Sequence, residues 1–467
     1  MTSDDRFEEL LSGLLADVAP TRVPERLVPE ILRAARRERR WPRWLALIKE
    51  PPMRISSRVA VGSPTMRLAR VTAVSVALVL VLGAAVGAVA SLVPSPSPLP
   101  PPPTTAPTSP TLPPAACTAV VCATGPLADA RAGQSATRLA DGSVLVIGGA
   151  TDSWTTFLLD AERWEPSSGT FGPAGSLAAG RHGHTATLLP DGRILVVGGY
   201  GQPGSDGDAI ASAEVWDPAT STFSTTGPLS RPRAGQGAAL LPDGRVLIMG
   251  GWGGPASSST DTTEIWDPST GAFSPGPTMS EPRGGVVAVT LDDGRVLVVG
   301  GNEKARASAE VFDPTTFTFT RTGGLPQPGD FTVALLPDGR VLAVGGPGAQ
   351  SVTTGQVWDP TTGIWAQTGS PLVPYTFFQT ETALEDGRVL LNAGAGELWD
   401  PVTGVFTDVD PTAPGMGMQS ATLLADGRVL VIGGVDSTNN AGFATASIWD
   451  VRGFTPPAPT ASASPAP

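Results

Sequence analysis

The sequence has 467 residues, a formal net charge of −12 and 41% hydrophobic residues. Its charges are divided unevenly: residues 1–70 hold 14 Lys and Arg against 9 Asp and Glu, whereas residues 94–467 hold 17 against 34. So acidic a C-terminal portion would repel phosphate groups, which argues against nucleic acid as its partner.

The first residues favour short helices. The Ser3 hydroxyl can cap one helix, and a second helix is expected from Pro29 onward. Residues 39–44 mix arginine with tryptophan, which is typical of a segment that lies on anionic lipid. The alternative is that residues 1–50 contact a cytoplasmic protein.

Residues 71–93 form a run of 23 residues without a charge. Such a run is long enough to cross a bilayer as one tilted helix. Four arginines lie just before it: Arg54, Arg58, Arg67 and Arg70. The positive-inside rule then predicts a single-pass protein of the cell membrane, with residues 1–70 in the cytoplasm and the remainder outside. A signal peptide cut after Ala90 is the alternative, but the stretch before the apolar run is too long for a leader.

This layout of short cytoplasmic helices, one span and an outer domain resembles that of bacterial membrane-bound anti-sigma factors. The zinc-binding members of that family use His and Cys, and residues 1–94 contain neither. The resemblance therefore implies a transmembrane regulator without the zinc motif.

Residues 94–116 are rich in Pro, Ser and Thr, and residues 456–467 are rich in Pro, Ala and Ser. A proline-rich chain is stiff and extended, at about 3.1 Å per residue, so the first segment is expected to hold the outer domain away from the membrane. The second segment is expected to be a disordered tail. Residues 117–455 remain as the outer domain.

One pattern recurs seven times in this domain: an Asp-Gly turn followed by four or five apolar residues. The turn glycines are Gly142, Gly192, Gly244, Gly294, Gly339, Gly387 and Gly427. Asp-Gly between apolar runs predicts a hairpin, because glycine accepts the positive φ of the turn. The apolar runs do not alternate, so they predict strands buried on both faces.

An aromatic residue, usually in Trp-Asp-Pro, follows each turn, and a second aromatic follows seven positions later in six of the copies. One unit therefore predicts four short strands, as at residues 185–189, 194–197 and 213–216 and around Phe223. The distance from the first aromatic to the next turn glycine is 27–29 residues, whereas the distance from a turn glycine to its own aromatic varies from 12 to 24. Constant spacing indicates a packed scaffold, and variable loops are where binding usually takes place.

The two ends of this domain complement each other. Residues 121–127 parallel residues 223–229, so they predict a fourth strand without the first three, while the last unit lacks a full fourth strand. Pairing of these ends would close a ring and remove the exposed sheet edges. The predicted fold class is therefore all-β: a seven-bladed β-propeller closed by an N-terminal strand.

The repeat resembles a Kelch repeat in the order of its residues: Arg181-x-x-His184, an apolar strand, Gly198-Gly199, Trp216-Asp217-Pro218 and Phe223. The resemblance covers roughly residues 120–450 and implies a propeller, a fold that serves both binding proteins and enzymes. Galactose oxidase is a copper enzyme of Kelch type with Tyr and His ligands, but this chain has only two Tyr and two His. No metal and no other cofactor are therefore expected.

Few side chains could carry chemistry. His182 and His184 alternate around Gly183, either as a metal ligand or base or as partners of a hydrogen bond to a neighbouring blade. The second interpretation is favoured, because no further His or acidic cluster lies at ligand spacing. The chain contains neither Gly-x-Ser-x-Gly nor a phosphate-binding loop, so no catalytic residue is predicted.

The two cysteines, Cys117 and Cys122, are expected outside the membrane, where disulfides persist. An extended strand would hold their Cα atoms too far apart for a bond. A disulfide therefore requires the chain to double back over residues 118–121, and two free thiols are the alternative.

The predicted binding site lies on one rim, where the variable segments meet the connections between blades. Its members are aromatic, arginine and histidine side chains: Trp154, Tyr200, Trp252, Arg131, Arg181, Arg233, Arg283 and His182. Aromatic and arginine residues most often anchor interfaces. For the arginines, the alternative is that they tie neighbouring blades together.

The expected function is that of a membrane-anchored extracytoplasmic module that binds or senses a protein or glycan. One alternative is a carbohydrate-active enzyme on the same scaffold, which an acidic pair with a raised pKa in the central channel would favour. The other alternative is the transmembrane regulator described above.

Overall fold

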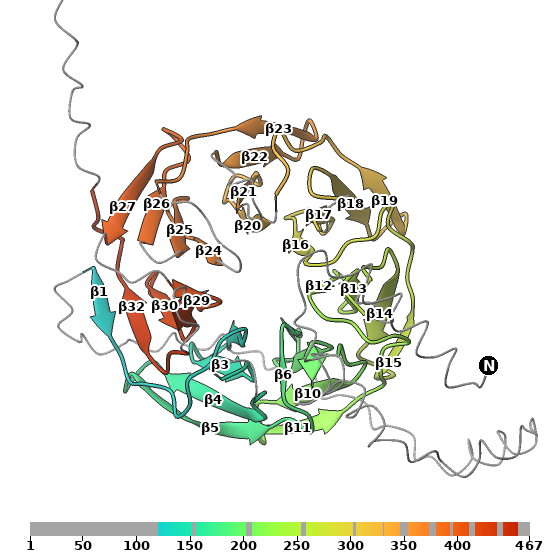
Figure 1. Ribbon diagram of the computed structural model, residues 1–467, viewed down its shortest axis with the longest axis vertical. Helices are drawn as coiled ribbons and strands as arrows, with labels where there is room; N and C mark the ends of the chain where they lie inside the picture. Colours follow the sequence, from blue (N-terminus) through green and yellow to red (C-terminus); the bar gives the residue numbers. More distant parts are fainter. Residues whose placement is uncertain are drawn as a thin grey trace, which may run out of the picture. The chain divides into compact units, whose positions relative to one another are not determined.

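Seven four-stranded antiparallel sheets form the blades of a ring around a central opening in the computed structural model (Figure 1). Blade 1 consists of β2–β5, and the blades follow the chain to blade 7, which has the order β29-β30-β32-β1. The structure describes residues 120–151, 156–201, 208–253, 258–301, 305–329, 331–345, 354–372, 380–392, 396–410, 416–436 and 442–455. The helical segment, the membrane span, the linker and the tail that the sequence predicts lie outside these residues.

Each blade begins with a strand beside the central opening and ends with a strand at the outside of the ring. The innermost strands are β2 (Ser135–Arg138), β7 (Thr185–Leu188), β12 (Gly237–Leu240), β16 (Val287–Thr290), β20 (Phe331–Leu335), β24 (Thr380–Ala383) and β29 (Ser420–Leu423). The second strands are β3 (Val144–Ile147), β8 (Ile194–Val197), β13 (Val246–Met249), β17 (Val296–Val299), β21 (Val341–Gly345), β25 (Val389–Asn392) and β30 (Val429–Ile432).

The third strands carry the repeated tryptophan or phenylalanine: β4 (Asp160–Glu165), β10 (Ala213–Asp217), β14 (Thr263–Asp267), β18 (Ala309–Asp313), β22 (Gln356–Asp359), β26 (Gly396–Trp399) and β32 (Ala446–Trp449). The outermost strands are β5 (Thr170–Ser176), β11 (Thr222–Thr225), β15 (Ala272–Pro275), β19 (Thr318–Arg321), β23 (Ile364–Gln367), β27 (Phe406–Asp410) and β1 (Val121–Ala123).

The predicted ring closure is confirmed by the pairing of β1 with β32. Val121 lies opposite Trp449, and Cys122 lies opposite Ile448. The innermost strands of neighbouring blades also contact one another all the way around, including β29 of blade 7 with β2 of blade 1. The N-terminal strand therefore completes the last blade and leaves no gap in the ring.

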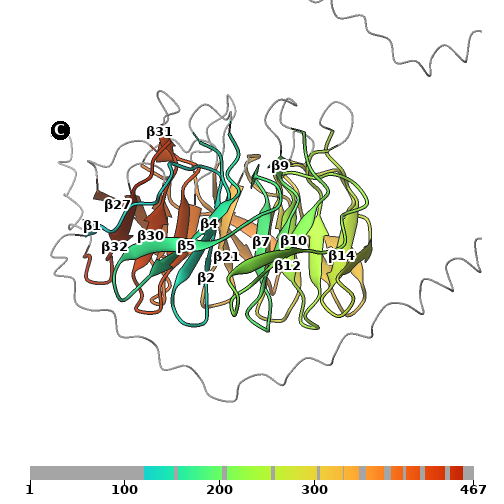
Figure 2. The same ribbon diagram turned by 90° about the horizontal axis from the view of Figure 1, so that it is seen from below.

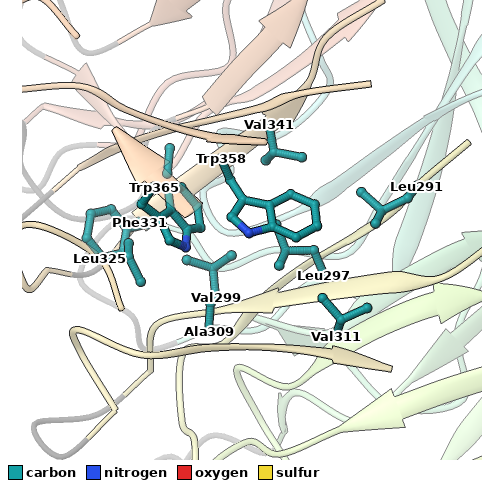
Figure 3. Close-up of a cluster of buried hydrophobic side chains, with 11 residues drawn as sticks. Leu291, Leu297, Val299, Ala309, Val311, Leu325, Phe331, Val341, Trp358 and Trp365 are labelled. Carbon is teal, nitrogen blue, oxygen red and sulfur yellow. The ribbon is translucent and has the colours of Figure 1, made fainter. Parts of the chain in front are cut away.

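The hydrophobic core is divided into seven clusters, each between the faces of two neighbouring blades. Figure 3 shows the cluster between blades 4 and 5, where the Trp358 indole lies near Leu297 and Val341. The second strands are buried along their whole length, as their unbroken apolar runs predict. Fully burying one such Val, Leu or Ile side chain stabilises the fold by about 1.5–3 kcal/mol.

Hydrogen bonds from the repeated tryptophans join the outer parts of the blades. The indole Nε1 of Trp266 donates to Thr226 Oγ1 of the preceding blade at 3.1 Å, and Thr226 donates to Gly271 O at 2.7 Å. The same contact joins three other pairs: Trp164 with Thr124, Trp358 with Thr322, and Trp399 with Thr368. A buried tryptophan thus finds the polar partner that its N–H requires.

Four arginines join the blades on the inner side, each through both its backbone and its side chain. The carbonyl oxygen of Arg233 accepts a hydrogen bond from Gly199 N of blade 2 at 2.8 Å. Its guanidinium donates to Gly250 O at 3.0 Å and to Glu264 at 2.9 Å, both in blade 3. The same backbone bond occurs for Arg131 with Gly434, Arg181 with Gly149, and Arg283 with Gly251.

The Gly-Gly pair is required at this junction. A Cβ at Gly198 would lie only 2.5 Å from Arg233 O, so any larger residue would displace the arginine backbone. Gly198 and Gly199 also have φ of 60° and 95°, which side chains rarely adopt. The pairs that end the second strands of blades 7, 1, 2 and 3 therefore each receive the backbone of the next blade's arginine.

The ion pair of Arg181 with Glu214 allows a direct test of this junction. The two side chains are 0% and 3% exposed, with Nη2 and Oε1 2.6 Å apart. Arg181→Ala leaves the Glu214 carboxylate buried without its partner, so we expect the free energy of unfolding to fall by about 3–5 kcal/mol. Denaturant unfolding of the full chain measures the loss.

The matched control is Arg193→Ala. Arg193 pairs with Asp191 in a solvent-accessible Asp-Gly turn of the same blade. Surface pairs contribute about 0.2–1 kcal/mol. Equal losses for the two variants would contradict the role assigned to the buried arginines.

Candidate functional site

Short backbone pairings build one rim of the ring. β6 (Arg181–His182) pairs with β9 (Tyr200–Gly201), and β28 (Met416–Gly417) pairs with β31 (Val435–Asp436). Each ribbon joins a connection between blades to the segment that follows a second strand. The prediction that these two kinds of segment share a rim is therefore confirmed, and Figure 2 shows β9 and β31 on the same side of the ring.

These pairings bring the aromatic residues to the central opening. His182 lies opposite Tyr200 in the β6–β9 ribbon, and an isolated bridge joins Ala234 to Trp252 in blade 3. The residue after Arg131, Arg181 or Arg233 thus faces the first residue after Gly-Gly. The contact that joins the blades therefore also positions these side chains.

A hydrogen-bonded arc of backbone runs around the opening through blades 7, 1, 2, 3 and 4. Gly133 N donates to Met418 O at 3.2 Å, and Gly183 N donates to Gly133 O at 3.1 Å. Gly235 N in turn donates to Gly183 O, and Gly285 N donates to Gly235 O at 2.9 Å. All five residues have positive φ. Four of the five are glycines, and the fifth is Met418, whose backbone is strained at a φ of 59°. Such strain is often found at functional sites.

One pocket of about 560 Å³ opens over this arc. Ten described residues line it: Gly133, Gln134, His182, Gly183, His184, Tyr200, Gly235, Trp252, Met418 and Gln419. Its volume lies within the range of small-molecule sites, about 300–1,000 Å³. The pocket brings together three of the predicted binding residues, His182, Tyr200 and Trp252.

Aromatic rings make up one side of the pocket. The His182 ring stacks against Tyr200, with centroids 5.2 Å apart and planes at 27°, and its centroid lies 4.8 Å from that of Phe157. Trp252 lies against bare backbone, since a Cβ at Gly235 would be 2.4 Å from the indole. Glycine in the arc therefore makes room for the indole.

Both histidines are uncharged at neutral pH. Burial lowers the pKa of His182 to about 4 and that of His184 to about 3, where Arg181 adds to the effect. His184 Nε2 lies 2.9 Å from Ser135 Oγ of blade 1. The interpretation of a hydrogen bond to a neighbouring blade is thus confirmed for His184.

The four arginines predicted to bind ligand are placed in the interior: Arg131, Arg181, Arg233 and Arg283 are 0–1% exposed. Their guanidiniums form ion pairs with Glu162, Glu214, Glu264 and Glu310 of the third strands. They tie the blades together and present no charge to the pocket, which corrects their inclusion among the ligand-contacting residues. The signal in the sequence was a Glu two positions before each of four repeated aromatics.

Two other predictions fall wholly or partly outside the described residues. Trp154 is one of them. Cys122 is disulfide-bonded, and Cys117, the only other cysteine in the sequence, also lies outside the described residues.

A buried carboxyl that sequence reasoning missed lies on the inner strand of blade 6. Burial raises the pKa of Glu381 to about 8, although its Oε1 accepts hydrogen bonds from Thr332 Oγ1 at 2.7 Å and Val344 N at 3.1 Å of blade 5. The other six blades have Ala or Val at this repeat position. That contrast was the available signal.

Nothing described around the pocket assembles a metal centre or an acid pair. The residues that line it include no Asp or Glu. In the described parts of the chain, no group of three or more His, Cys, Asp or Glu side chains could hold a metal ion. Likewise, none of the described residues forms a helix long and apolar enough to cross a membrane.

Comparison with known families identifies Kelch motifs in blades 2 and 3. Two family models, both described as Kelch motif, match residues 180–230 and 233–280. No curated protein matches the chain. Among solved structures, a fungal alcohol oxidase of the AA5 family in complex with copper is 18% identical, with a TM-score of 0.56 over 72% of this chain and 78% of its own. That likeness shows the propeller fold alone.

The Glu381 carboxyl predicts a pH dependence of stability. Its pKa is about 8 in the folded chain and 4.5 for the free side chain, so between these values the folded state binds more protons and stability falls as pH rises. Glu381→Gln removes this loss. We expect its melting temperature to equal that of the unchanged chain near pH 4 and to exceed it near pH 9, by about 2–4 °C per kcal/mol.

The control for this measurement is Glu385→Gln, at an exposed position of the same blade. Its melting curve should follow that of the unchanged chain at every pH. A Glu381→Gln curve that also runs parallel to the unchanged chain would contradict the assigned pKa.

Proposed function

We propose that this seven-bladed propeller with Kelch motifs is a binding or sensing module, and that it holds a protein or glycan ligand on the rim formed by blades 7, 1, 2 and 3. The observation that carries the proposal is the pocket over the central opening, where Tyr200 and Trp252 converge with His182. Aromatic anchors in a concave, largely preformed site are typical of recognition surfaces.

The construction of the rim supports this proposal. The four-stranded sheets form a scaffold that changes little from blade to blade, and buried arginines held by Gly-Gly pairs join blades 7, 1, 2, 3 and 4. The segments after the second strands vary most in length, and they supply Tyr200 and Trp252. Variable loops on a rigid scaffold are the usual location of binding residues.

The enzyme alternative gains little from the described residues. Glu381 is a carboxyl with a raised pKa, but its Oε1 is engaged between blades 5 and 6 and it does not line the pocket. The acidic pair that glycoside chemistry requires is not among the residues that line the pocket. The likeness to an alcohol oxidase extends to the fold and carries no activity.

The proposal includes a membrane anchor, which rests on the sequence. Residues 71–93 carry no charge, arginines precede them, and residues 94–467 carry an excess of acidic groups. These features favour a cytoplasmic N-terminus with the propeller outside the cell. In that arrangement, residues 1–50 are available to a cytoplasmic protein, as in the regulator that the layout resembles.

Protease protection tests this topology. We expect protease added to intact spheroplasts that express the full chain to digest the propeller and to spare residues 1–70, because the membrane shields the cytoplasmic side. Epitope tags at the two ends report the fragments on immunoblots. Survival of the propeller until the membrane is permeabilised would contradict the proposed orientation.

Replacement of Trp252 tests the position of the site. Ligands captured by the full chain on a glycan array or from a cell-surface protein extract supply the probe. Trp252→Ala should weaken the binding of this captured ligand by about thirtyfold, since a central aromatic anchor contributes about 2 kcal/mol or more to the free energy of binding. Binding is measured by calorimetry, and circular dichroism checks that the propeller is folded.

The matched control for this variant is Thr270→Ala. Thr270 is exposed in the turn between β14 and β15 on the opposite rim. Its replacement should leave the affinity unchanged. A comparable loss of binding from Thr270→Ala would show that the ligand is held on the other face.

A further inference from the structure

Four consecutive blades place a buried polar residue at the start of their inner strands. These residues are Gln419 in blade 7, Gln134 in blade 1, His184 in blade 2 and Gln236 in blade 3, and each is at most 9% exposed. Three of them, Gln134, His184 and Gln419, line the pocket. The lining of the pocket therefore combines buried polar side chains with aromatic rings.

Hydrogen bonding fixes which way two of the amides point. Gln134 Nε2 donates to Ile432 O at 2.8 Å, and Gln236 Nε2 donates to Val197 O at 2.7 Å. A backbone carbonyl can only accept, so the amide nitrogen must face it and the amide oxygen must face away. In both residues the Oε1 atom is then buried without a hydrogen-bond partner.

In Gln419 both amide atoms are unsatisfied, because neither its Nε2 nor its Oε1 has a hydrogen-bond partner. The His184 Nδ1 atom is likewise buried and unpartnered. Because His184 is neutral, this nitrogen accepts a hydrogen bond in one of its two tautomers. Buried groups of this kind cost about 1–3 kcal/mol each when they stay unsatisfied, and such exceptions call for a partner that occupies the site.

The net charge of the domain indicates the sign of the charge that this partner carries. Residues 94–467 hold 34 acidic against 17 basic side chains, so a cation is attracted to the domain and an anion is repelled. Arg181, whose charge acts on His184 in the lining, is paired with Glu214. The pocket thus has no positive charge of its own to oppose a cation.

The aromatic rings of the pocket also favour a positively charged ligand. Tyr200 and Trp252 both line the pocket. The face of such a ring carries negative potential and attracts ammonium and guanidinium groups. Unpartnered acceptor atoms and aromatic rings in one lining suit a ligand group that is positively charged and rich in N–H donors.

We propose that the pocket binds an organic cation, a primary ammonium or a guanidinium group, which donates hydrogen bonds to Gln134 and Gln419 and lies against Tyr200 and Trp252. This inference rests on the proposed binding function and names the group that the pocket holds. A lysine or arginine side chain of a protein ligand and a free polyamine share this chemistry.

Calorimetric titration of the full chain in lipid nanodiscs tests the inference. The probes are Nα-acetyl-lysine methylamide and Nα-acetyl-arginine methylamide for the peptide source, and spermidine for the free source. The neutral controls are the Nε-acetylated lysine derivative and N-acetylglucosamine. We expect at least one cationic probe to bind, the neutral controls to fail, and the affinity to fall with added salt. The probe that binds identifies the source.

The discriminating variant is Gln419→Leu. Because neither amide atom of Gln419 has a protein partner, its replacement leaves no group of the fold unsatisfied, and the melting temperature should not fall. Binding of the cationic probe should weaken by about tenfold, as expected for the loss of a hydrogen bond to a charged group. Thr270→Ala on the opposite rim should bind as the unchanged chain does.

Three results would overturn the inference. N-acetylglucosamine could bind while the cations do not, no probe could bind, or Gln419→Leu could leave the affinity for the cation unchanged. The proposed binding function is separable from these outcomes, because it stands if a captured ligand still depends on Trp252. It fails together with the inference only if no captured ligand depends on that residue.

Discussion

The contact between a Gly-Gly pair and the arginine of the next blade, which occurs at four consecutive junctions from blade 7 to blade 4, is the one on which the rest of this structure depends. At the junction of blades 2 and 3, Gly199 N donates to Arg233 O, and a Cβ at Gly198 would lie only 2.5 Å from that oxygen. The guanidinium then binds Glu264 in its own blade. One residue therefore fixes two blades, and its buried charge is tolerated because the partner carboxylate is buried with it.

The same contact determines where recognition can take place. The residue after three of the arginines lies opposite the first residue after Gly-Gly, so anchoring the ring also brings His182 to Tyr200 and Ala234 to Trp252. The arginines lie at the start of blades 1 to 4, and the residues that line the pocket come from blades 7, 1, 2 and 3. In blade 4 the corresponding glycine meets a side chain instead, since a Cβ at Gly300 would be 3.2 Å from Phe331. The ring is thus asymmetric, and its most regular part carries the pocket.

The repeat made most of the fold predictable from the sequence. The Asp-Gly turns, the unbroken apolar runs and the constant spacing are local or periodic signals, and they fixed the seven blades and the pairing of β1 with β32. The arginines were harder, because a charged side chain is usually exposed and the acidic partner of Arg181 is 33 residues away. The unpartnered amide atoms of Gln134 and Gln419 could not be predicted, since a missing partner is visible only in three dimensions.

Native-state hydrogen exchange of the full chain, with and without a bound ligand, tests the account most directly. It predicts that the amides of Gly149, Gly199 and Gly251 exchange only through global unfolding in both states, because they hold the blades together. Exchange slowed by the ligand should be confined to residues 182–184, Tyr200 and Trp252. Slowing at the Asp-Gly turns of the opposite rim, or fast local exchange at the three glycines, would contradict it.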